Sequence, residues 1–435
     1  MQQEQEGLRR EIGVLGLSAN IINIVVGAGI FVLPAIVAAG LGSAGILAYL
    51  VCGFLIIMIM LCFAEVGSKV TKSGGSYAYI ETAFGKYPGF LTANLFVFSA
   101  VTSDAAVANA LADTLGFIFP VFNNALFKSG CIVLIFSGLI FINVRGVKNG
   151  INMVKFTVFA KLIPLLLLVL IGWIDISWEN LEITSMPSAR TLGEVTLILF
   201  FAFQGGETGL NISGEIKNPN RTVPRGILLG ISIVLLLYIL IQITAQGVLG
   251  TSLADFKEAP LAEVGRVVFG PFGLTLIVIG GAISMFGNLT GEILNIPRII
   301  FRASKDETMP PKILSMVHPK YRTPYIAIIV YGSMSCILAL LGEFEQLAIL
   351  SSASILLIYL GVTFSLVKLR RDDKEGSDSF KAPGGYIVPV IAIITIVWLL
   401  SNLSTTEQIG ITIFMAILSG IYYMMHLLKS NKKTD

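Results

Sequence analysis

The stretch Asn20-Ile-Ile-Asn-Ile-Val-Val-Gly-Ala-Gly-Ile-Phe31 places two glycines in the middle of a long apolar segment. A second apolar segment carries a similar interruption, Leu199-Phe-Phe-Ala-Phe-Gln-Gly-Gly-Glu-Thr-Gly-Leu210. Each segment is long enough to cross a bilayer, and its glycines allow the helix to unwind there. Unwound backbone at membrane depth is tolerated only where it lines a cavity or is buried in protein. Two such breaks in corresponding halves of a chain predict the substrate site of a transporter.

The composition predicts an all-α polytopic membrane protein. The chain is 55% hydrophobic and 13% charged, with a mean hydropathy of +0.83, whereas soluble domains are roughly 25% charged. Apolar runs of about 20 residues recur along the whole length, as expected of membrane-spanning helices. The short alternating segments of a membrane β-barrel are absent from the sequence.

Residue types that carry enzyme or metal chemistry are sparse. The four cysteines lie inside apolar runs without metal-ligand spacing, and there are only two histidines. No metalloprotease, redox-cysteine or phosphate-loop pattern is present. The net charge of +3 is too small to indicate nucleic-acid binding. We therefore expect no catalytic residues, no metal and no cofactor.

Hydropathy predicts twelve transmembrane helices. Their approximate ranges are 13–39, 42–66, 88–118, 124–143, 151–173, 191–214, 225–249, 270–301, 324–341, 346–368, 385–403 and 408–428.

The distribution of basic residues predicts that both termini are cytoplasmic. With the N-terminus inside, 24 of the 30 lysines and arginines fall in inside segments and four in outside segments. This asymmetry agrees with the positive-inside rule. The polar N-terminus has no cleavable-signal pattern. An integral plasma membrane protein, in a bacterial inner membrane, is the expected location.

The broken spans are the first and the sixth, which predicts a 5+5 inverted repeat followed by two further helices. Residues 1–435 then form a single transmembrane transporter domain. Its first repeat covers about 13–173, its second about 191–368, and the two C-terminal helices about 385–428.

The first break offers backbone groups to both ends of an amino acid. Unwinding around Gly27, Ala28 and Gly29 leaves amide N–H groups at the start of the second half-helix, where a carboxylate is favoured. The carbonyl groups that end the first half-helix, near Val25, can accept from an ammonium group. Close packing of helices through small residues is the structural alternative.

The second break adds aromatic and polar side chains. Phe201 or Phe203 could close over a substrate, and Gln204 and Glu207 lie beside unwound backbone. A carboxylate inside the membrane is costly and indicates function by default. Glu207 could hydrogen-bond freed backbone groups, bind a substrate ammonium or carry a proton. Capping of the half-helix is its structural alternative.

A loop motif follows the second break, Glu215-Ile-Lys-Asn-Pro-Asn-Arg-Thr-Val-Pro224. Together with Gly27-Ala-Gly-Ile-Phe31, this motif resembles the amino acid–polyamine–organocation (APC) superfamily over about residues 10–430. The resemblance implies an amino acid permease with twelve helices in the LeuT-like inverted repeat. It further implies transport by alternating access.

The same resemblance implies contacts for the substrate. The carboxylate would meet the amides of Ala28 and Gly29, and the ammonium would meet carbonyl groups near Val25, Phe201 and Gln204. Many members of the superfamily have serine or threonine in the first break. This chain has Ala28, so a hydroxyl contact made there is lost.

Lys161 lies about a third of the way into the fifth predicted span. Burial in the membrane disfavours a charged lysine, so this side chain could carry a proton. In similar superfamily members, a lysine in this helix stands where sodium sits in sodium-coupled relatives. That resemblance implies bonds from Lys161 to first-helix carbonyl groups and to a polar residue of the eighth helix, Ser284 or Asn288. A lysine that snorkels to the inner interface is the structural alternative.

Two other intramembrane acids have open roles. Asp104 could face the substrate path and favour a cationic side chain, or it could lie in water near the outer mouth. Glu292 could pair with Arg298 or Lys305 along its own helix.

The sequence therefore predicts a sodium-independent secondary transporter of amino acids that acts as a proton symporter or as an antiporter. A cationic amino acid or polyamine antiporter is the alternative, with Asp104 or Glu207 recognising the second positive charge. The expected partners are a small amino acid substrate, protons if a proton gradient drives uptake, and the lipid bilayer. We expect neither nucleic acid nor an obligatory accessory subunit.

Overall fold

The computed structural model describes residues 12–70, 75–146, 150–207, 216–305, 309, 311–372 and 380–431. Within these ranges the chain is helical, with a single isolated β-bridge between Ile12 and Ile216. Gly209 and Glu215, which belong to the sequence motifs above, lie outside the described residues. The α-helices are α1 (Val14–Val25), α2 (Gly29–Leu41), α3 (Ile46–Lys69), α4 (Gly75–Phe84), α5 (Lys86–Ile118), α6 (Ala125–Arg145), α7 (Gly150–Gly172), α8 (Ala189–Leu199), α9 (Pro219–Leu249), α10 (Pro260–Phe269), α11 (Pro271–Lys305), α12 (Tyr325–Leu341), α13 (Phe344–Asp372), α14 (Ile387–Ser401) and α15 (Thr405–Asn431).

Short 3-10 helices connect or extend several of these elements. They are η1 (Gly42–Gly45), η2 (Pro120–Asn123), η3 (Trp173–Asp175), η4 (Trp178–Leu181), η5 (Phe200–Phe203), η7 (Gly250–Asp255) and η8 (Lys312–Ser315). Glycine ends helices where the backbone reverses: Gly250 has φ of +58° after α9, a conformation that other residues adopt only at a cost.

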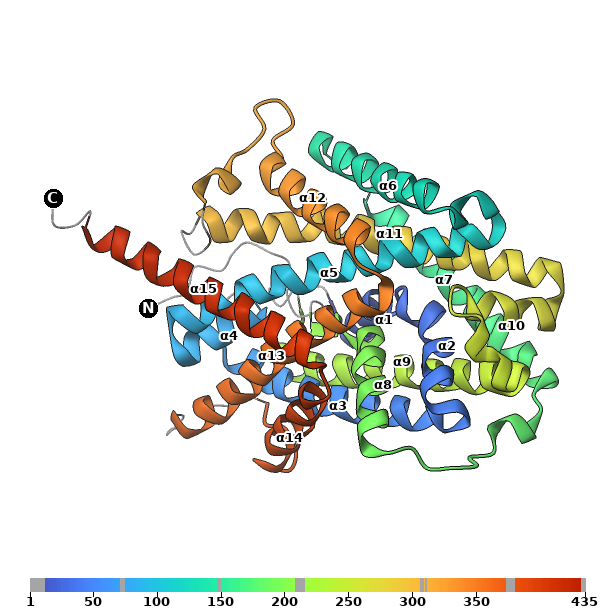
Figure 1. Cartoon of the computed structure of the whole chain (residues 1–435). Helices are drawn as coiled ribbons and strands as arrows, with labels where there is room; N and C mark the ends of the chain where they lie inside the picture. Colours follow the sequence, from blue (N-terminus) through green and yellow to red (C-terminus); the bar gives the residue numbers. More distant parts are fainter. Residues whose placement is uncertain are drawn as a thin grey trace.

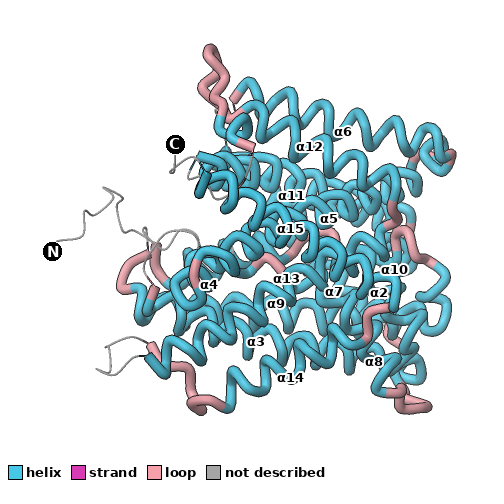
Figure 2. The backbone as a smooth tube through the Cα atoms, turned by 60° about the vertical axis from the view of Figure 1, so that its left-hand side comes forward, coloured by secondary structure: helices cyan, strands magenta, loops and turns pink. Residues whose placement is uncertain are grey.

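The helices pack as a layered bundle (Figure 1). In Figure 2, α6 and α12 form one side, α3, α8 and α14 form the other, and α5, α11 and α13 lie between them. Seven helical segments of the described chain are long and apolar enough to cross a membrane. They are 29–69, Lys86–Ile118, Ala125–Arg145, 221–255, Pro271–Lys305, Phe344–Asp372 and 405–427. The protein is therefore an integral membrane protein.

Eleven of the twelve predicted spans coincide with one helix or with a broken pair of helices, and the sixth does so over its described part, because residues 208–214 lie outside the described residues. The first span is divided into α1 and α2, and the sixth into α8 and η5. Hydropathy did not predict α4 and α10, because helices of ten residues are too short to give a spanning signal.

The third predicted span is one continuous helix, α5, although it contains several polar residues. Its polar side chains bond mainly to backbone or to neighbouring helices. Thr102 donates to the Phe98 carbonyl oxygen at 2.9 Å, and Asn109 donates to the Ala339 carbonyl oxygen at 2.8 Å. Polar groups with partners can be buried in a membrane helix without breaking it.

A buried ion pair ties α3 to α13. Glu65 is fully buried, and Arg370 donates to both of its carboxylate oxygens, at 2.8 Å from Nε and with a second bond from Nη2. The Ala382 amide donates to the same carboxylate at 2.7 Å. These bonds join the ends of two helices to the segment that leads into α14.

Replacing Arg370 with methionine is expected to destabilise the protein by about 3–5 kcal/mol, because Glu65 would be left as a buried charge without its main partner. Thermal unfolding in detergent measures the effect. Arg190→Met is the matched control, since the Arg190–Glu194 pair is exposed and should contribute less than about 1 kcal/mol. Equal shifts for the two variants would contradict a stabilising role for the Glu65 pair.

Candidate functional site at two broken helices

The first break lies between α1 and α2. The Gly27 amide donates to the Val25 carbonyl oxygen at 2.8 Å, and the Ala28 carbonyl oxygen accepts from the Phe31 amide at 3.0 Å. Within the described residues, the amides of Ala28 and Gly29 have no acceptor. Two free, buried N–H groups therefore stand at the start of α2, where the helix dipole favours an anion.

The second break follows α8. After η5, Gln204 is extended (φ −75°, ψ 162°) and Gly205 has φ of +99°, a value that suits glycine. The two breaks touch: a Cβ atom on Gly29 would lie 2.8 Å from both Cα and Cβ of Ala202. No side chain larger than a hydrogen atom fits at Gly29 without a shift of the backbone at Ala202.

Tyr238 of α9 joins the two breaks through its hydroxyl group. The hydroxyl oxygen lies 2.9 Å from the Val25 carbonyl oxygen and 3.1 Å from the Ala202 carbonyl oxygen. The ring packs edge-on against Phe203, with centroids 5.1 Å apart. One buried phenol thus contacts carbonyl groups that both helix breaks have freed.

Removing the Tyr238 hydroxyl should weaken transport while the ring packing stays. In Tyr238→Phe, the two carbonyl groups lose a donor, at a cost of about 1–3 kcal/mol. We expect kcat/KM for uptake to fall by roughly tenfold to a hundredfold. Tyr79→Phe removes another buried phenol, which lies in α4 and packs against Phe63. It is the control, and an equal loss in both variants would indicate a general packing defect.

Lys161 of α7 reaches the end of α1. Its side chain is buried, and its ammonium donates to the Val26 carbonyl oxygen at 2.8 Å and to the Asn23 carbonyl oxygen. Among the described residues it makes no bond to Ser284 or Asn288. The Asn288 amide instead lies beside Gly27, 3.3 Å from where a Cβ atom would be. Ser284 is buried on the same helix, and its hydroxyl has no partner in the described chain.

The predicted side chains of the second break are held by α13. Gln204 donates to the Ser351 hydroxyl at 3.1 Å, and that hydroxyl lies 3.0 Å from the Ser99 carbonyl oxygen of α5. Glu207 accepts from the Gly205 amide at 3.1 Å and from the Tyr359 hydroxyl. The Glu207 carboxylate therefore bonds backbone freed by the break, which is one of the roles that the sequence left open.

The two phenylalanines differ in their surroundings. Phe203 is fully buried between Tyr49 and Tyr238, so its ring is part of the core. Phe201 packs edge-on against Phe344 at the start of α13, with centroids 5.6 Å apart. Of the two rings, Phe201 is thus the better candidate for an aromatic lid.

Three acids lie within the helical bundle: Asp104 of α5, Glu207 of the second break and Glu292 of α11. Asp104 is fully buried and accepts from the Tyr331 hydroxyl at 2.8 Å, so it does not lie in water. In the described chain, Glu292 forms no ion pair with Arg298, which donates instead to the Leu294 carbonyl oxygen.

Sequence reasoning missed Tyr238, Ser351 and Tyr359. Tyr238 and Tyr359 are isolated polar residues in apolar runs, and Ser351 opens the short polar cluster Ser351-Ser352-Ala353-Ser354. This polarity is the available signal, because a buried hydroxyl group needs a partner. The sequence does not indicate which partner, since the bonds from Tyr238 to Val25 and from Tyr359 to Glu207 join residues more than 150 positions apart.

Comparison with known proteins identifies the family. Residues 12–426 match the profile of the amino acid permease family. The serine/threonine exchanger SteT of Bacillus subtilis (strain 168) is 29% identical, over 99% of this chain and 100% of its own length. The branched-chain amino acid permease BcaP of the same strain is 24% identical over 97% of this chain and 94% of its own. The human cystine/glutamate transporter is 28% identical over 97% of this chain and 86% of its own. The chain is therefore an amino acid transporter rather than an enzyme, and it belongs to the amino acid permease family.

Proposed function

We propose that the chain is a sodium-independent secondary transporter that moves amino acids by alternating access. The observation that carries the proposal is the position of Lys161, whose ammonium donates to the carbonyl groups of Asn23 and Val26. A fixed cation in this place takes up the oxygen ligands that a sodium ion would need. Transport then requires no external metal ion.

The substrate site consists of the two breaks. The free amides of Ala28 and Gly29 bind the carboxylate, and carbonyl groups near Phe201 and Gln204 bind the ammonium. The Val25 carbonyl oxygen already accepts from Tyr238, so its share of the ammonium site is smaller than the sequence alone suggests. Phe201 closes over the bound amino acid.

The membrane arrangement belongs to the same proposal. Twelve spans, with repeats at about 13–173 and 191–368 and two further helices, place both termini in the cytoplasm of a bacterial cell. Supporting this, the described parts of the predicted spans are helical apart from the breaks. The segments that carry most of the lysines and arginines then face the side where the positive-inside rule expects them. No accessory subunit takes part.

Exchange of one amino acid for another is the proposed mode, supported by the likeness to the exchanger SteT. Purified protein in proteoliposomes tests it. We would screen the twenty amino acids and putrescine without sodium, with and without internal substrate, at an outside pH equal to or below the inside pH. Uptake that requires internal substrate and ignores the pH gradient supports exchange. Uptake that requires the gradient supports proton symport through Lys161, and a requirement for sodium would refute the assignment of Lys161.

One observation favours a cationic substrate as the second candidate. Glu292 has no ion-pair partner in the described chain, and it follows Asn288 by one helical turn in α11, where the Asn288 amide lies beside Gly27 of the first break. If the substrate carries a second positive charge, Glu292→Gln should weaken inhibition by arginine or putrescine about tenfold and leave inhibition by neutral amino acids unchanged. Lack of inhibition by any cation in the wild-type protein would eliminate this candidate.

A further inference from the structure

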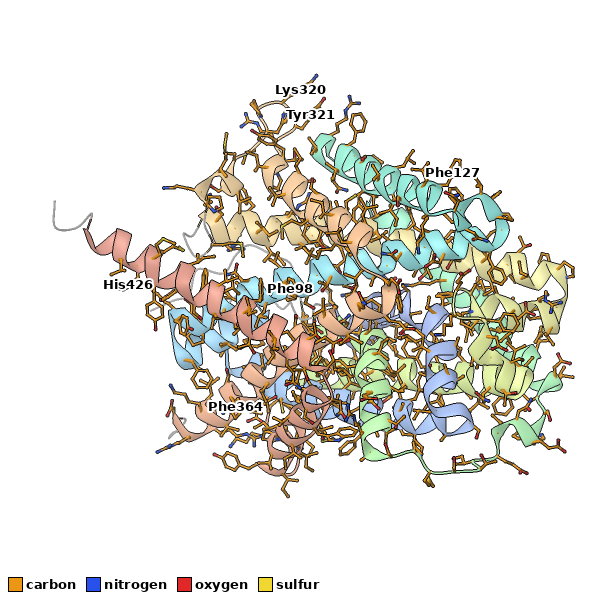
Figure 3. All side chains as sticks on the ribbon, in the orientation of Figure 1. Phe98, Phe127, Lys320, Tyr321, Phe364 and His426 are labelled. Atoms are coloured by element: carbon orange, nitrogen blue, oxygen red, sulfur yellow. The ribbon has the colours of Figure 1, made fainter. Side chains whose placement is uncertain are left out.

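A groove remains that the transport site does not use. It has a volume of about 1040 Å³ and lies between α4, α5, α13 and α15, with Tyr386 at one end. Its walls are mainly apolar, and Phe364 on its α13 side is 44% exposed. Figure 3 shows Phe364 at the edge of the bundle, away from the loop that carries Lys320.

The groove changes character along α13. Leu357, Gly361 and Phe364 give it an apolar end, and Lys368 and Arg371 give it a basic end beside Asp372, the one acid among the described residues that line it. Lys368 also lies over the Phe84 ring, 5.1 Å from its centroid. Such a groove, with apolar side chains at one end and basic side chains at the other, suits an amphiphile with an anionic headgroup.

The length of the groove matches one leaflet of a bilayer. Fourteen residues separate Leu357 from Arg371, or about 21 Å along a helix. Half of a bilayer, with its headgroups, is about 20–22 Å thick. Tyr386 is half-exposed at the basic end, as tyrosines at membrane interfaces commonly are.

We propose that this groove binds one anionic phospholipid of the cytoplasmic leaflet. An acyl chain lies along Leu357 and Phe364, and the phosphate group contacts Lys368 and Arg371. The proposal uses the membrane orientation given under the proposed function, because that orientation puts the basic end at the cytoplasmic surface. It does not depend on which amino acid is carried.

Binding at this groove would act on the transport site through α13. The same helix carries Ser351 and Tyr359, which bond Gln204 and Glu207 of the second break. A lipid packed against α13 thus stabilises the helix that holds this break. We expect uptake to be faster in liposomes that contain phosphatidylglycerol than in liposomes of phosphatidylcholine alone.

Native mass spectrometry of delipidated protein in detergent tests the binding directly. Wild-type protein should retain one phosphatidylglycerol and prefer it to phosphatidylcholine. Each basic residue near an anionic headgroup contributes roughly a factor of five, so Lys368→Gln/Arg371→Gln should reduce that preference about 25-fold. Leu357→Trp fills the apolar end and should weaken binding of both lipids.

A matched control variant makes the test decisive. Arg302→Gln/Lys320→Gln removes the same charge from exposed positions outside the groove and should leave the preference unchanged. Unchanged lipid preference in the groove variant, or an equal loss of preference in both variants, would overturn the proposal.

Two other occupants of the groove would also refute the proposal. Displacement of the lipid by inorganic phosphate would indicate a site for a soluble anion. A dimer whose interface covers the groove would indicate a second copy of the chain. Stabilisation of the same samples by amino acids reports separately on the proposed function.

Discussion

Replacing Lys161 with alanine should reduce amino acid uptake to about 1% of the wild-type rate or less. The ammonium donates to two buried carbonyl groups at the end of α1, and a charged hydrogen bond contributes about 1.5–3 kcal/mol. Loss of about 3 kcal/mol from the transport-competent arrangement corresponds to roughly a hundredfold in rate. Initial uptake rates in proteoliposomes measure the effect.

The variant also separates the two roles given to Lys161. Lys161→Met keeps most of the side-chain volume and should fail as Lys161→Ala does, because both lack the positive charge. Lys128→Ala, which removes a partly exposed lysine paired with Asp113, should transport normally. If residual uptake in Lys161→Ala keeps the pH dependence of the wild-type protein, Lys161 is not a proton carrier. Normal uptake by Lys161→Ala in the absence of sodium would refute the role of Lys161 as a stand-in for the ion.

Gly29→Val should weaken substrate binding strongly while the protein still inserts. The Cβ atom would lie 2.8 Å from two atoms of Ala202, and one of these is backbone, so the two breaks must separate. Overpacking of this kind costs about 1–3 kcal/mol, and the displaced amides of Ala28 and residue 29 lose their alignment. We expect affinity to fall about tenfold to a hundredfold, measured by substrate-induced thermal stabilisation or by isothermal titration calorimetry.

A matched glycine gives the control. Gly138 lies in α6 with no atom within 4 Å of the position of its Cβ atom, so Gly138→Val should bind substrate normally. Wild-type affinity in Gly29→Val would place the substrate site elsewhere in the bundle.

The sequence predicted those features that depend on local composition. Glycines within apolar runs predicted the interruptions after Val25 and Leu199, and both are present. Hydropathy located the helices because each span is a continuous apolar run. Lys161 stood out because a charge inside such a run is costly.

Long-range pairings could not be predicted in this way. Hydropathy contains no information on which helices face one another, so the contact between Gly29 and Ala202 and the bonds of Tyr238 came only from the structure. For the same reason, Asp104 was left between water and the substrate path, whereas it is buried and bonded to Tyr331 of α12.

The hydroxyl group of Tyr238 has one hydrogen and two carbonyl oxygens within reach, one at each helix break. If the protein works by the proposed alternating access, the two breaks move relative to each other, and the hydrogen can follow only one of the two carbonyl oxygens. In that proposed cycle, the chemical environment of this phenol would differ between the inward-open and outward-open states. Fluorotyrosine at position 238 would give a separate nuclear magnetic resonance line for each orientation of the hydroxyl group. The line intensities would give the populations of these orientations.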